Sequence, residues 1–413
     1  MRQIKKLKMP KLKVLKQNRR LQQLTAALTI VIVVAIGTYL LSGARAQSPY
    51  VAIGADSGTL GGSATTQSNT SATDGKYVQF GSASSSSGSF EPLVGEITSP
   101  IGGNSYWPSP AQYQSWLGHK VDIIGWYDQQ VSGSWYDIEG NDTDVSTLAS
   151  VANTVGAKVE LGAAMLPTDG TYCQDPYSST SCYDTDLTAL ADGAAGDFNS
   201  NFQELAQNLV NDGLSNAIIR LGWESNGDWY PWSSYISPTD FDAYWVQIVD
   251  SMRSVSGEHF LFDWNGAAGN LGTTSTPATD AYPGDNYVDF IGEDIYDNSS
   301  WSNNSVALQS ISSFAAQHNK YVILGEWGVG SLIGGCSGSN DDPTFIQNMY
   351  NYIYNLNNRV AAAMYFNECD SALYSINPGT APGYAGGNTL PNSAALYQSL
   401  FSKAPAGVFP SSP

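Results

Sequence analysis

Two glutamates are the residues of this sequence best placed to do chemistry together. Glu224 follows the apolar run Ile218–Trp223 and Glu326 follows Tyr321–Gly325, so each carboxylate ends a segment with the composition of a buried strand. A buried carboxylate is costly unless it is paired or takes part in a reaction. Two carboxylates across a cleft are the minimal set for hydrolysis of a glycosidic bond. We therefore expect Glu224 and Glu326 to face each other across a sugar-binding cleft, the alternative being that one of them only pairs with Arg220 in the core.

The histidines argue against the other common hydrolytic chemistries. The chain has three of them: His119 and His259 precede strand-like runs, and His318 ends a helix-like one. In a parallel sheet the first two would lie at the end opposite the glutamates. A Ser-His-Asp triad, a histidine-ligated zinc site and a histidine general base are therefore disfavoured, and no metal or other cofactor is expected.

The segments that must position the glutamates alternate between strand-like and helix-like patterns. This alternation predicts a parallel sheet with crossover helices. Eight strand-like runs between residues 92 and 403 fit an α/β fold of the (β/α)8 type, the TIM barrel, which needs ~250 residues. An open doubly wound sheet is the alternative, but no Gly-rich phosphate loop follows the first run. The predicted strands are Leu93–Ile97, Val121–Trp126, Val159–Ala163, Ala217–Trp223, Phe260–Trp264, Val288–Ile295, Val322–Glu326 and Ala361–Phe366.

In such a barrel the chemistry lies at the carboxyl ends of the strands. Side chains two residues apart share one face of a strand. Arg220 and Glu224 should therefore point inward from the fourth strand, and Val322, Leu324 and Glu326 from the seventh. Because these two strands lie across the barrel from each other, their carboxylates can converge on one substrate bond.

Aromatic and polar side chains gather at the same predicted end of the barrel. Sugar rings present C–H faces that pack on aromatic rings, and their hydroxyls need amide or acid partners. Each tryptophan alone is compatible with core packing, but their concentration at one end favours a sugar site. The candidate substrate-binding residues are Arg220, Trp223, Asn226, Trp229, Trp232, Trp264, Asp294, Tyr296 and Trp327.

Charge is divided unequally along the chain. Residues 1–46 contain ten Lys and Arg and no acid, whereas the remaining 367 contain eight Lys and Arg and all 37 Asp and Glu. An acidic body repels nucleic acid. It suits a neutral partner, and an aromatic content of 12% fits a polysaccharide. A monomer that binds polysaccharide and no nucleic acid is expected.

The amino terminus predicts export. Nine basic residues lie between Arg2 and Arg20, and the 18 residues Leu24–Leu41 carry no charge. That run is long enough to span a bilayer, with its basic flank in the cytoplasm. Ala44–Ala46 offers a small-x-small signal-peptidase site. A cleaved signal and a retained membrane anchor both remain open, and either places the rest of the chain outside the cell.

Composition divides the chain into five segments. Asp74–Gly81 predicts a short strand inside a Ser/Gly/Thr-rich linker. The segments are a basic region at 1–23, the signal or anchor at 24–46, the linker at 47–91, the catalytic barrel at 92–403 and a tail at 404–413.

Four cysteines are consistent with disulfides in an oxidising compartment. Cys173 and Cys182 lie nine residues apart in one loop, and Cys336 and Cys369 follow two neighbouring strands. We expect these two pairs to form disulfides, with free buried thiols as the alternative. A Cys₄ zinc site is disfavoured because the CxxC spacing is missing.

Two motifs suggest a family. The run Arg220–Trp232, with the sequence Arg-Leu-Gly-Trp-Glu-Ser-Asn-Gly-Asp-Trp-Tyr-Pro-Trp, resembles the acid/base motif of glycoside hydrolase family 26, the β-mannanase family of a large clan of (β/α)8 glycosidases. Gly325–Gly328 looks like the nucleophile motif of that family. Val288–Tyr296 is similar to its sixth strand, whose tyrosine lies near the nucleophile.

The resemblance covers roughly residues 92–403 and implies a role for each glutamate. Glu224 corresponds to the acid/base of the family and Glu326 to its nucleophile. The family commonly has His immediately before the acid/base, where this chain has Trp223. This difference bears on the sugar bound beside the carboxylates, because an indole has no acceptor and a differently placed donor.

Together these patterns predict an exported retaining endo-β-glycanase that acts by double displacement. Mannan is the first expected substrate, with xylan or a mixed-linkage glucan as the alternative. A second hypothesis is a non-catalytic surface barrel that binds polysaccharide without cleaving it.

Overall fold

A computed structural model gives the chain as two units, Met1–Ser85 and Ser86–Pro413. The structure describes residues 65–68, 76–79, 90–97, 109–128, 133–173, 175–268, 278–297, 300–329, 341–367, 375–376 and 390–410. The predicted basic region and the signal or anchor segment, residues 1–46, lie outside these ranges. Among the residues described, no helix combines the length and apolarity needed to cross a bilayer.

The first unit contains one described pair of strands. β1 (Thr65–Ser68) and β2 (Lys76–Gln79) pair antiparallel. β2 falls within the segment Asp74–Gly81, for which the sequence predicts a short strand.

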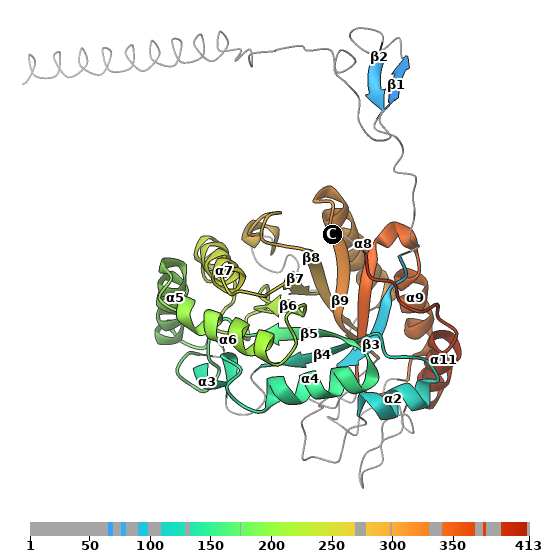
Figure 1. Cartoon of the computed structure of the whole chain (residues 1–413), viewed down its shortest axis with the longest axis horizontal. Coiled ribbons are helices and arrows are strands. Elements are labelled where there is room, and N and C mark those ends of the chain that lie inside the picture. Colours follow the sequence, from blue (N-terminus) through green and yellow to red (C-terminus); the bar gives the residue numbers. More distant parts are fainter. Residues whose placement is uncertain are drawn as a thin grey trace, which may run out of the picture. The chain divides into compact units, whose positions relative to one another are not determined.

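Eight parallel strands close into a barrel in the second unit (Figure 1). Each overlaps one of the eight predicted strands, and the (β/α)8 fold is confirmed. The strands follow the order β10-β3-β4-β5-β6-β7-β8-β9 around the barrel, so consecutive strands are neighbours. They are β3 (Leu93–Ile97), β4 (Ile123–Tyr127), β5 (Lys158–Ala163), β6 (Ile218–Leu221), β7 (Leu261–Ala267), β8 (Phe290–Tyr296), β9 (Tyr321–Gly328) and β10 (Val360–Phe366).

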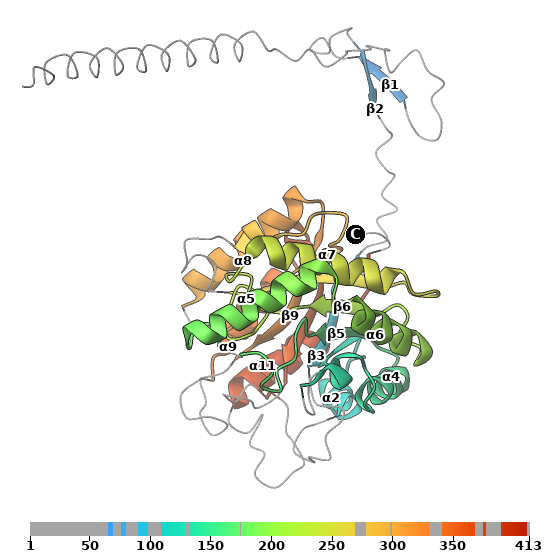
Figure 2. The ribbon, with the colours of Figure 1, turned by 90° about the vertical axis from the view of Figure 1, so that its left-hand side faces the viewer.

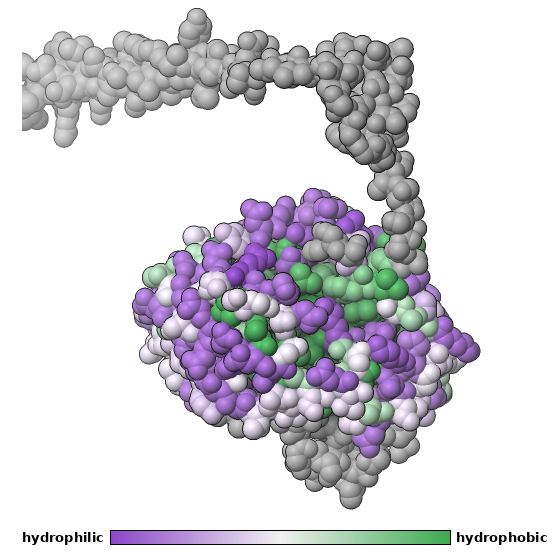
Figure 3. Space-filling model, viewed as in Figure 1, coloured by the Kyte–Doolittle hydropathy of each residue, from purple (hydrophilic) through white to green (hydrophobic). Residues whose placement is uncertain are grey.

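Helices surround the barrel and turn their apolar faces toward it (Figures 1 and 2). Figure 3 shows mainly polar residues on the outside of this unit, with fewer apolar residues between them. Ser237 and Asp342 cap α7 and α9, each followed by a proline in the first turn. The described helices are α2 (Pro110–Leu117), α3 (Trp135–Ile138), α4 (Asp144–Val155), α5 (Thr180–Ala195), α6 (Asn199–Asn211), α7 (Pro238–Arg253), α8 (Trp301–Gln317), α9 (Pro343–Ile353) and α11 (Pro391–Phe401), with 3₁₀ turns η2 (Ala278–Ala281) and η4 (Leu356–Asn358).

One predicted face on β9 is wrong. Val322 and Leu324 belong to the apolar layer between the strands and the helices, whereas Ile323 belongs to the layer inside the barrel. Strict two-residue alternation from Val322 would also have turned Glu326 outward.

A β-bulge turns Glu326 back toward the barrel interior. Along the pairing of β8 with β9, Gly292 is opposite Ile323 and Asp294 is opposite Glu326. Two residues of β8 therefore match three of β9, and the extra residue reverses the side-chain alternation. The carboxylate reaches the interior because of this irregularity, which the sequence pattern does not reveal.

The amino end of the barrel is closed by chain from both ends of the unit. Glu91 and Val408 exchange backbone hydrogen bonds at 3.2 and 2.9 Å. The ring of Phe409 packs 5.3 Å from that of Phe290 inside the barrel. With this end covered, a substrate is expected at the carboxyl ends of the strands.

One predicted disulfide is present. Cys173 and Cys182 are bonded, with Cα atoms 5.4 Å apart. The bond closes a short loop between β5 and α5. Cys336 and Cys369 lie outside the described residues, so their pairing stays a prediction.

Candidate active site

Three carboxylates converge at the carboxyl end of the barrel. One oxygen from each of Glu224, Asp294 and Glu326 lies within 4.8 Å of the other two. Glu224 follows β6, Asp294 lies on β8 and Glu326 on β9. The expected meeting of Glu224 and Glu326 across the barrel is therefore present in the structure.

The chain turns sharply after β6 to place Glu224. β6 ends at Leu221, and both Gly222 and Glu224 have positive φ, at 54° and 50°. A side chain at Gly222 would overlap the sulfur of Met165, so glycine is the residue that fits this turn. Left-handed backbone is unfavourable for a glutamate. The amide of Glu224 donates to Oδ1 of Asn265 at 3.1 Å, a contact that helps to fix the turn.

Three donors hold the carboxylate of Glu326. Arg220 Nη2 donates to Oε1 at 2.7 Å. The hydroxyl of Tyr127 donates to the same oxygen, and the hydroxyl of Tyr296 donates to Oε2. A carboxylate held by a guanidinium and two hydroxyl donors has one fixed orientation.

Arg220 is the cation at the centre of the site. It is only 1% exposed and forms an ion pair with Asp294 as well as with Glu326. Its Nη2 also lies 3.3 Å from Oδ1 of Asn265, whose Nδ2 donates to Asp294 at 2.8 Å. Arg220 therefore binds carboxylates of the protein, and its contact with substrate stays a prediction.

A glycine on β9 leaves room for this guanidinium. A Cβ at Gly325 would lie 2.8 Å from Nε of Arg220 and 3.0 Å from Oδ1 of Asp294. These distances are too short for ordinary contact. Gly325, one residue before Glu326, thus has a steric reason to lack a side chain.

Glu224 has a different environment. Its Oε2 accepts a hydrogen bond from the indole of Trp229 at 2.8 Å. Burial, together with the negative charge of Glu326, raises the pKa of Glu224 to about 7, against the opposing effects of Arg220 and the Trp229 hydrogen bond. A carboxyl group with this pKa is protonated in a large fraction of molecules near neutral pH and can donate a proton.

Three converging carboxylates are also a ligand set that suits a divalent cation. Here the guanidinium of Arg220 contacts both Asp294 and Glu326. The positive charge that these two carboxylates need is therefore supplied by the protein itself.

Part of the predicted aromatic set packs behind the cleft. Trp223 lies near Tyr127, with ring centroids 4.9 Å apart, and also contacts Trp232. Trp232 is fully buried, stacks on Tyr230 and donates to the carbonyl of Trp223. The prediction that Trp232 contacts substrate is wrong, since its ring is enclosed by the loop that carries it.

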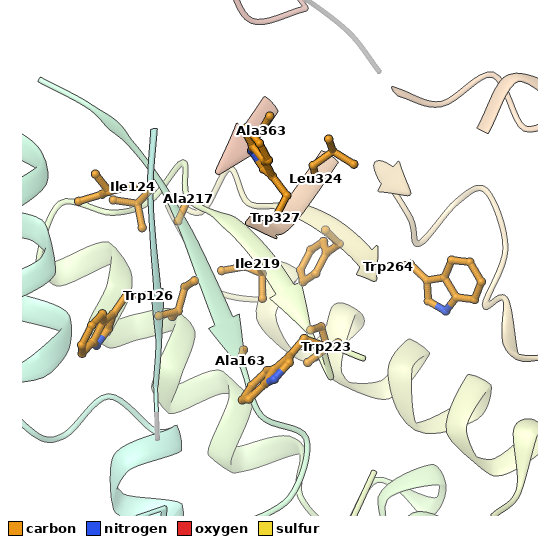
Figure 4. Close-up of a cluster of buried hydrophobic side chains, with 14 of the residues drawn as sticks. Ile124, Trp126, Ala163, Ala217, Ile219, Trp223, Trp264, Leu324, Trp327 and Ala363 are labelled. Atoms are coloured by element: carbon orange, nitrogen blue, oxygen red, sulfur yellow. The ribbon is translucent and has the colours of Figure 1, made fainter. Parts of the chain in front are cut away.

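Trp264 and Trp327 belong to the cluster of buried hydrophobic side chains (Figure 4). Their strand positions point outward, so Trp264 packs on Phe314 near α8, while Trp327 packs on Phe401 near α11. Asn226 is buried too, and its amide binds the backbone N–H and carbonyl of Ala267. The structure shows packing or backbone contacts for these three residues, and their contact with substrate stays a prediction.

Two residues of the site were not among the predicted site residues. Tyr127 ends β4 and contacts Glu326, and Asn265 on β7 links Glu224 to Asp294. A signal for Asn265 exists in the sequence. The run Phe262-Asp263-Trp264-Asn265 alternates apolar and polar residues, which places Asp263 and Asn265 on the inner face.

The sequence also matches a known family model. Residues 172–368 match Glycosyl hydrolase family 26, and the match includes both β6 with Glu224 and β9 with Glu326. This part of the barrel is therefore similar to glycoside hydrolase family 26. The resemblance seen in the two glutamate motifs is confirmed.

Two curated relatives align with part of the chain. Endoglucanase H of Acetivibrio thermocellus is 32% identical over 166 residues, 37% of this chain and 18% of that protein. A mannan endo-1,4-beta-mannosidase of Bifidobacterium adolescentis is 32% identical over 148 residues, 32% of this chain and 15% of that protein. The chain thus spans less than a fifth of the length of either relative.

Solved structures share the fold at lower identity. A modular endo-beta-1,4-mannanase from Cellulomonas fimi superposes with a TM-score of 0.56 at 20% identity, covering 77% of this chain and 72% of that one. A family 26 beta-mannanase from Bacteroides ovatus gives a TM-score of 0.52 at 16% identity, covering 77% of this chain and 90% of that one. These likenesses show a common (β/α)8 fold.

Proposed function

We propose that this domain is a retaining endo-β-glycanase that hydrolyses a β-linked polysaccharide. The observation that carries the proposal is the separation of its two catalytic candidates, with carboxylate oxygens of Glu224 and Glu326 within 4.8 Å. Retaining glycosidases hold their two carboxyl groups about 5–5.5 Å apart, whereas inverting ones need about 6.5–9.5 Å to admit a water. The shorter spacing leaves room for a sugar carbon between the two groups and no room for an extra water.

In the first step, Glu326 is the nucleophile and Glu224 is the acid. A carboxylate oxygen of Glu326 forms a bond to the anomeric carbon as the bond from that carbon to the leaving oxygen breaks. Glu224 transfers its proton to the leaving oxygen, and the sugar chain beyond the bond departs with a new hydroxyl. The domain then holds a glycosyl ester on Glu326 and an ionised Glu224.

In the second step the roles of Glu224 reverse. The carboxylate of Glu224 takes a proton from water as that water attacks the anomeric carbon, and the ester bond to Glu326 breaks. Two displacements at one carbon restore its original configuration. The pKa of about 7 suits Glu224 to both halves of this cycle, since neither proton state is strongly favoured at neutral pH.

Arg220, Tyr127 and Tyr296 position the nucleophile. Their three donors surround the carboxylate of Glu326, which is 6% exposed. They fix which lone pair faces the sugar, and this orientation is a large part of the rate gain in a preorganised site.

A β-1,4-linked mannan is the proposed substrate. The names of the curated relatives support a β-1,4-linked hexose chain, one being a mannan endo-1,4-beta-mannosidase and the other an endoglucanase. A glucan is therefore the second substrate to assay. Among the predicted tryptophan contacts, Trp229 lies beside Glu224, with a half-buried ring.

The test is to assay the parent chain, Glu326→Ala and Glu224→Ala on mannan, xylan and glucan, and to read reducing ends. We expect the parent to release sugar from one of them, and each variant to lose at least roughly a thousandfold in turnover. The variants should still bind the polysaccharide. Full turnover by Glu326→Ala would exclude the proposed nucleophile. Binding without sugar release by the parent would instead favour a non-catalytic binding barrel.

We also propose that the domain works outside the cell. The basic residues before Leu24–Leu41, the uncharged run itself and the disulfide Cys173–Cys182 support export. Fractionation of cells that produce the full chain tests this. Recovery in the membrane or the medium supports export, and recovery in the cytoplasm refutes it.

A further inference from the structure

Two buried carboxyl groups lie inside the barrel, nearer its amino end than the catalytic residues. Glu160 on β5 is 1% exposed, and Asp263 on β7 is fully buried. Among the described residues, neither oxygen of either carboxyl group has a hydrogen-bond partner. The mechanism proposed above does not use these two acids.

The strand register places the two acids in one layer of the interior. Side chains inside a (β/α)8 barrel form layers contributed by alternate strands, and a shear of about eight residues over eight strands advances a layer by about one residue per strand. Glu160 is opposite Ile218 of β6, which is opposite Leu261 of β7. Two strands beyond Glu160, its layer therefore reaches Asp263.

A glycine leaves room for one of the carboxyl groups. Gly292 lies on β8, next to β7, and a side chain there would overlap Oδ2 of Asp263. The carboxyl group of Asp263 thus occupies space that Gly292 leaves open.

The nearest cations are bound elsewhere. Arg220 is opposite Asp263 in the pairing of β6 with β7. Its guanidinium, however, donates to side chains nearer the carboxyl ends of the strands, which are Tyr127, Asn265, Asp294 and Glu326. On β5, the amine of Lys158 donates to a backbone carbonyl and lies over the ring of Phe409. Among the described residues, no ion pair includes Glu160 or Asp263.

The other titratable side chains inside the barrel add no positive charge. The inner positions of β3 and β10 are apolar or glycine. The remaining titratable side chains near the pair are Tyr127 on β4, Asp294 and Tyr296 on β8 and Glu326 on β9. Asp294 and Glu326 share the charge of Arg220, so further negative charge beneath them is opposed.

An unpaired carboxylate in such an interior is costly, and the group takes up a proton instead. We propose that Glu160 and Asp263 form a buried proton-binding site, which is neutral in the folded domain and leaves the guanidinium of Arg220 to Asp294 and Glu326. Burial raises the pKa of Asp263 to about 7, against the opposing effect of Arg220. Burial and the neighbouring Asp263 raise the pKa of Glu160 well above its usual value.

Folding of this domain should therefore take up protons. A carboxyl group whose pKa is about 4 in the unfolded chain and higher in the folded state binds its proton more tightly when folded. The stability that this proton gives is complete below pH 4 and is lost as the pH rises toward the pKa of Asp263 at about 7. An amide resembles the protonated acid at every pH, so Asp263→Asn avoids this loss.

The test is urea unfolding of the full chain at several pH values, for the parent and for Asp263→Asn. Tryptophan fluorescence reports the barrel unit, because all 11 tryptophans follow residue 106. The folding equilibrium constant of the variant, divided by that of the parent, should rise roughly tenfold for each pH unit between about 4 and 7. For Glu160→Gln this ratio should rise in the same direction.

Asp250→Asn is the control, because it makes the same chemical change at an exposed position of α7. Its ratio to the parent should not change with pH. A constant ratio for Asp263→Asn would mean that this side chain only fills space, and a ratio that falls with rising pH would mean that it is a charged partner of Arg220. Either result overturns the proposal. Failure of both Asp263→Asn and Glu160→Gln to fold would also overturn it, since a neutral acid tolerates an amide of its own size.

Infrared difference spectroscopy observes the protons directly. A protonated carboxyl group absorbs at a C=O frequency that neither a carboxylate nor an amide shares. At pH 6 the parent should therefore show bands in this region that Asp263→Asn and Glu160→Gln lack, whereas identical spectra would overturn the proton-binding site. Neither measurement needs a substrate, so the outcome is independent of the hydrolytic function proposed above.

Discussion

The pKa of Glu224 sets the alkaline limit of activity, and one hydrogen bond adjusts it. Activity requires Glu224 protonated in the first step, so kcat/KM should fall about tenfold for each pH unit above about 7. Because Glu224 and Glu326 lie within 4.8 Å, this limit belongs to the interacting pair. Trp229 donates to Oε2 of Glu224 at 2.8 Å and so stabilises its charged form. Trp229→Phe removes that donor, raises the pKa and moves the limit to higher pH.

The size of the pKa shift in Trp229→Phe depends on how exposed the hydrogen bond between Trp229 and Glu224 is. A hydrogen bond to a charged group contributes about 1.5–3 kcal/mol against no partner. Trp229 is half-buried, so in the variant a water molecule can take the place of the indole and restore part of the stabilisation of charged Glu224. A residual of about 1 kcal/mol corresponds to roughly a fivefold change in the ionisation equilibrium. We therefore compare the kcat/KM of Trp229→Phe with that of the parent at each pH. The ratio of variant to parent should be roughly fivefold higher at pH 9 than at pH 6.

The assay is the pH dependence of kcat/KM on a short aryl glycoside for the parent, Trp229→Phe and Trp116→Phe. Trp116 lies on α2, stacked on Tyr397 away from the cleft, and its replacement should leave the limit in place. A Trp229→Phe profile that coincides with the parent, or whose limit moves to lower pH, would refute the reasoning about this hydrogen bond.

Three further variants test the groups around the nucleophile. Arg220→Met leaves Asp294 and Glu326 without their buried cation, and urea unfolding at pH 7 should show a loss of about 3–5 kcal/mol; a variant as stable as the parent would contradict the ion-pair network. Tyr296→Phe removes one donor to Glu326, so steady-state kinetics should show kcat/KM lowered roughly tenfold to a hundredfold, and an unchanged value would mean that the hydroxyl does not act on the nucleophile. Gly325→Ala brings a methyl 2.8 Å from Arg220 Nε, and both the unfolding free energy, by about 1–3 kcal/mol, and kcat/KM should fall; full activity would show that the guanidinium can move.

The fold is readable from the sequence because its units are regular. Apolar runs alternate with helical patterns, and eight such repeats are typical of the closed (β/α)8 barrel. The pairing of Glu224 with Glu326 could be predicted for a related reason. Burying a carboxylate at the end of a strand costs free energy unless the group is paired or takes part in a reaction. Parallel strands also bring their carboxyl ends together.

The individual side chains were harder to predict because proximity to a strand end does not give direction. Trp264 lies in the middle of β7 and Trp327 near the end of β9, but both occupy outward positions and pack against helices. On β9 the bulge reverses the alternation, so Glu326 faces inward while Val322 and Leu324 do not. A one-residue irregularity of this kind depends on the partner strand and leaves no local signature.

The measurement that tests the central claim most directly is the configuration of the first product. Proton NMR of the reaction mixture, recorded within the first minutes on a β-linked oligosaccharide, distinguishes the two anomers before they interconvert. Carboxylates within 4.8 Å predict that the β anomer of the new reducing end appears first and the α anomer later. If the α anomer appears first, the reaction inverts, and the assignment of Glu326 as a covalent nucleophile is contradicted.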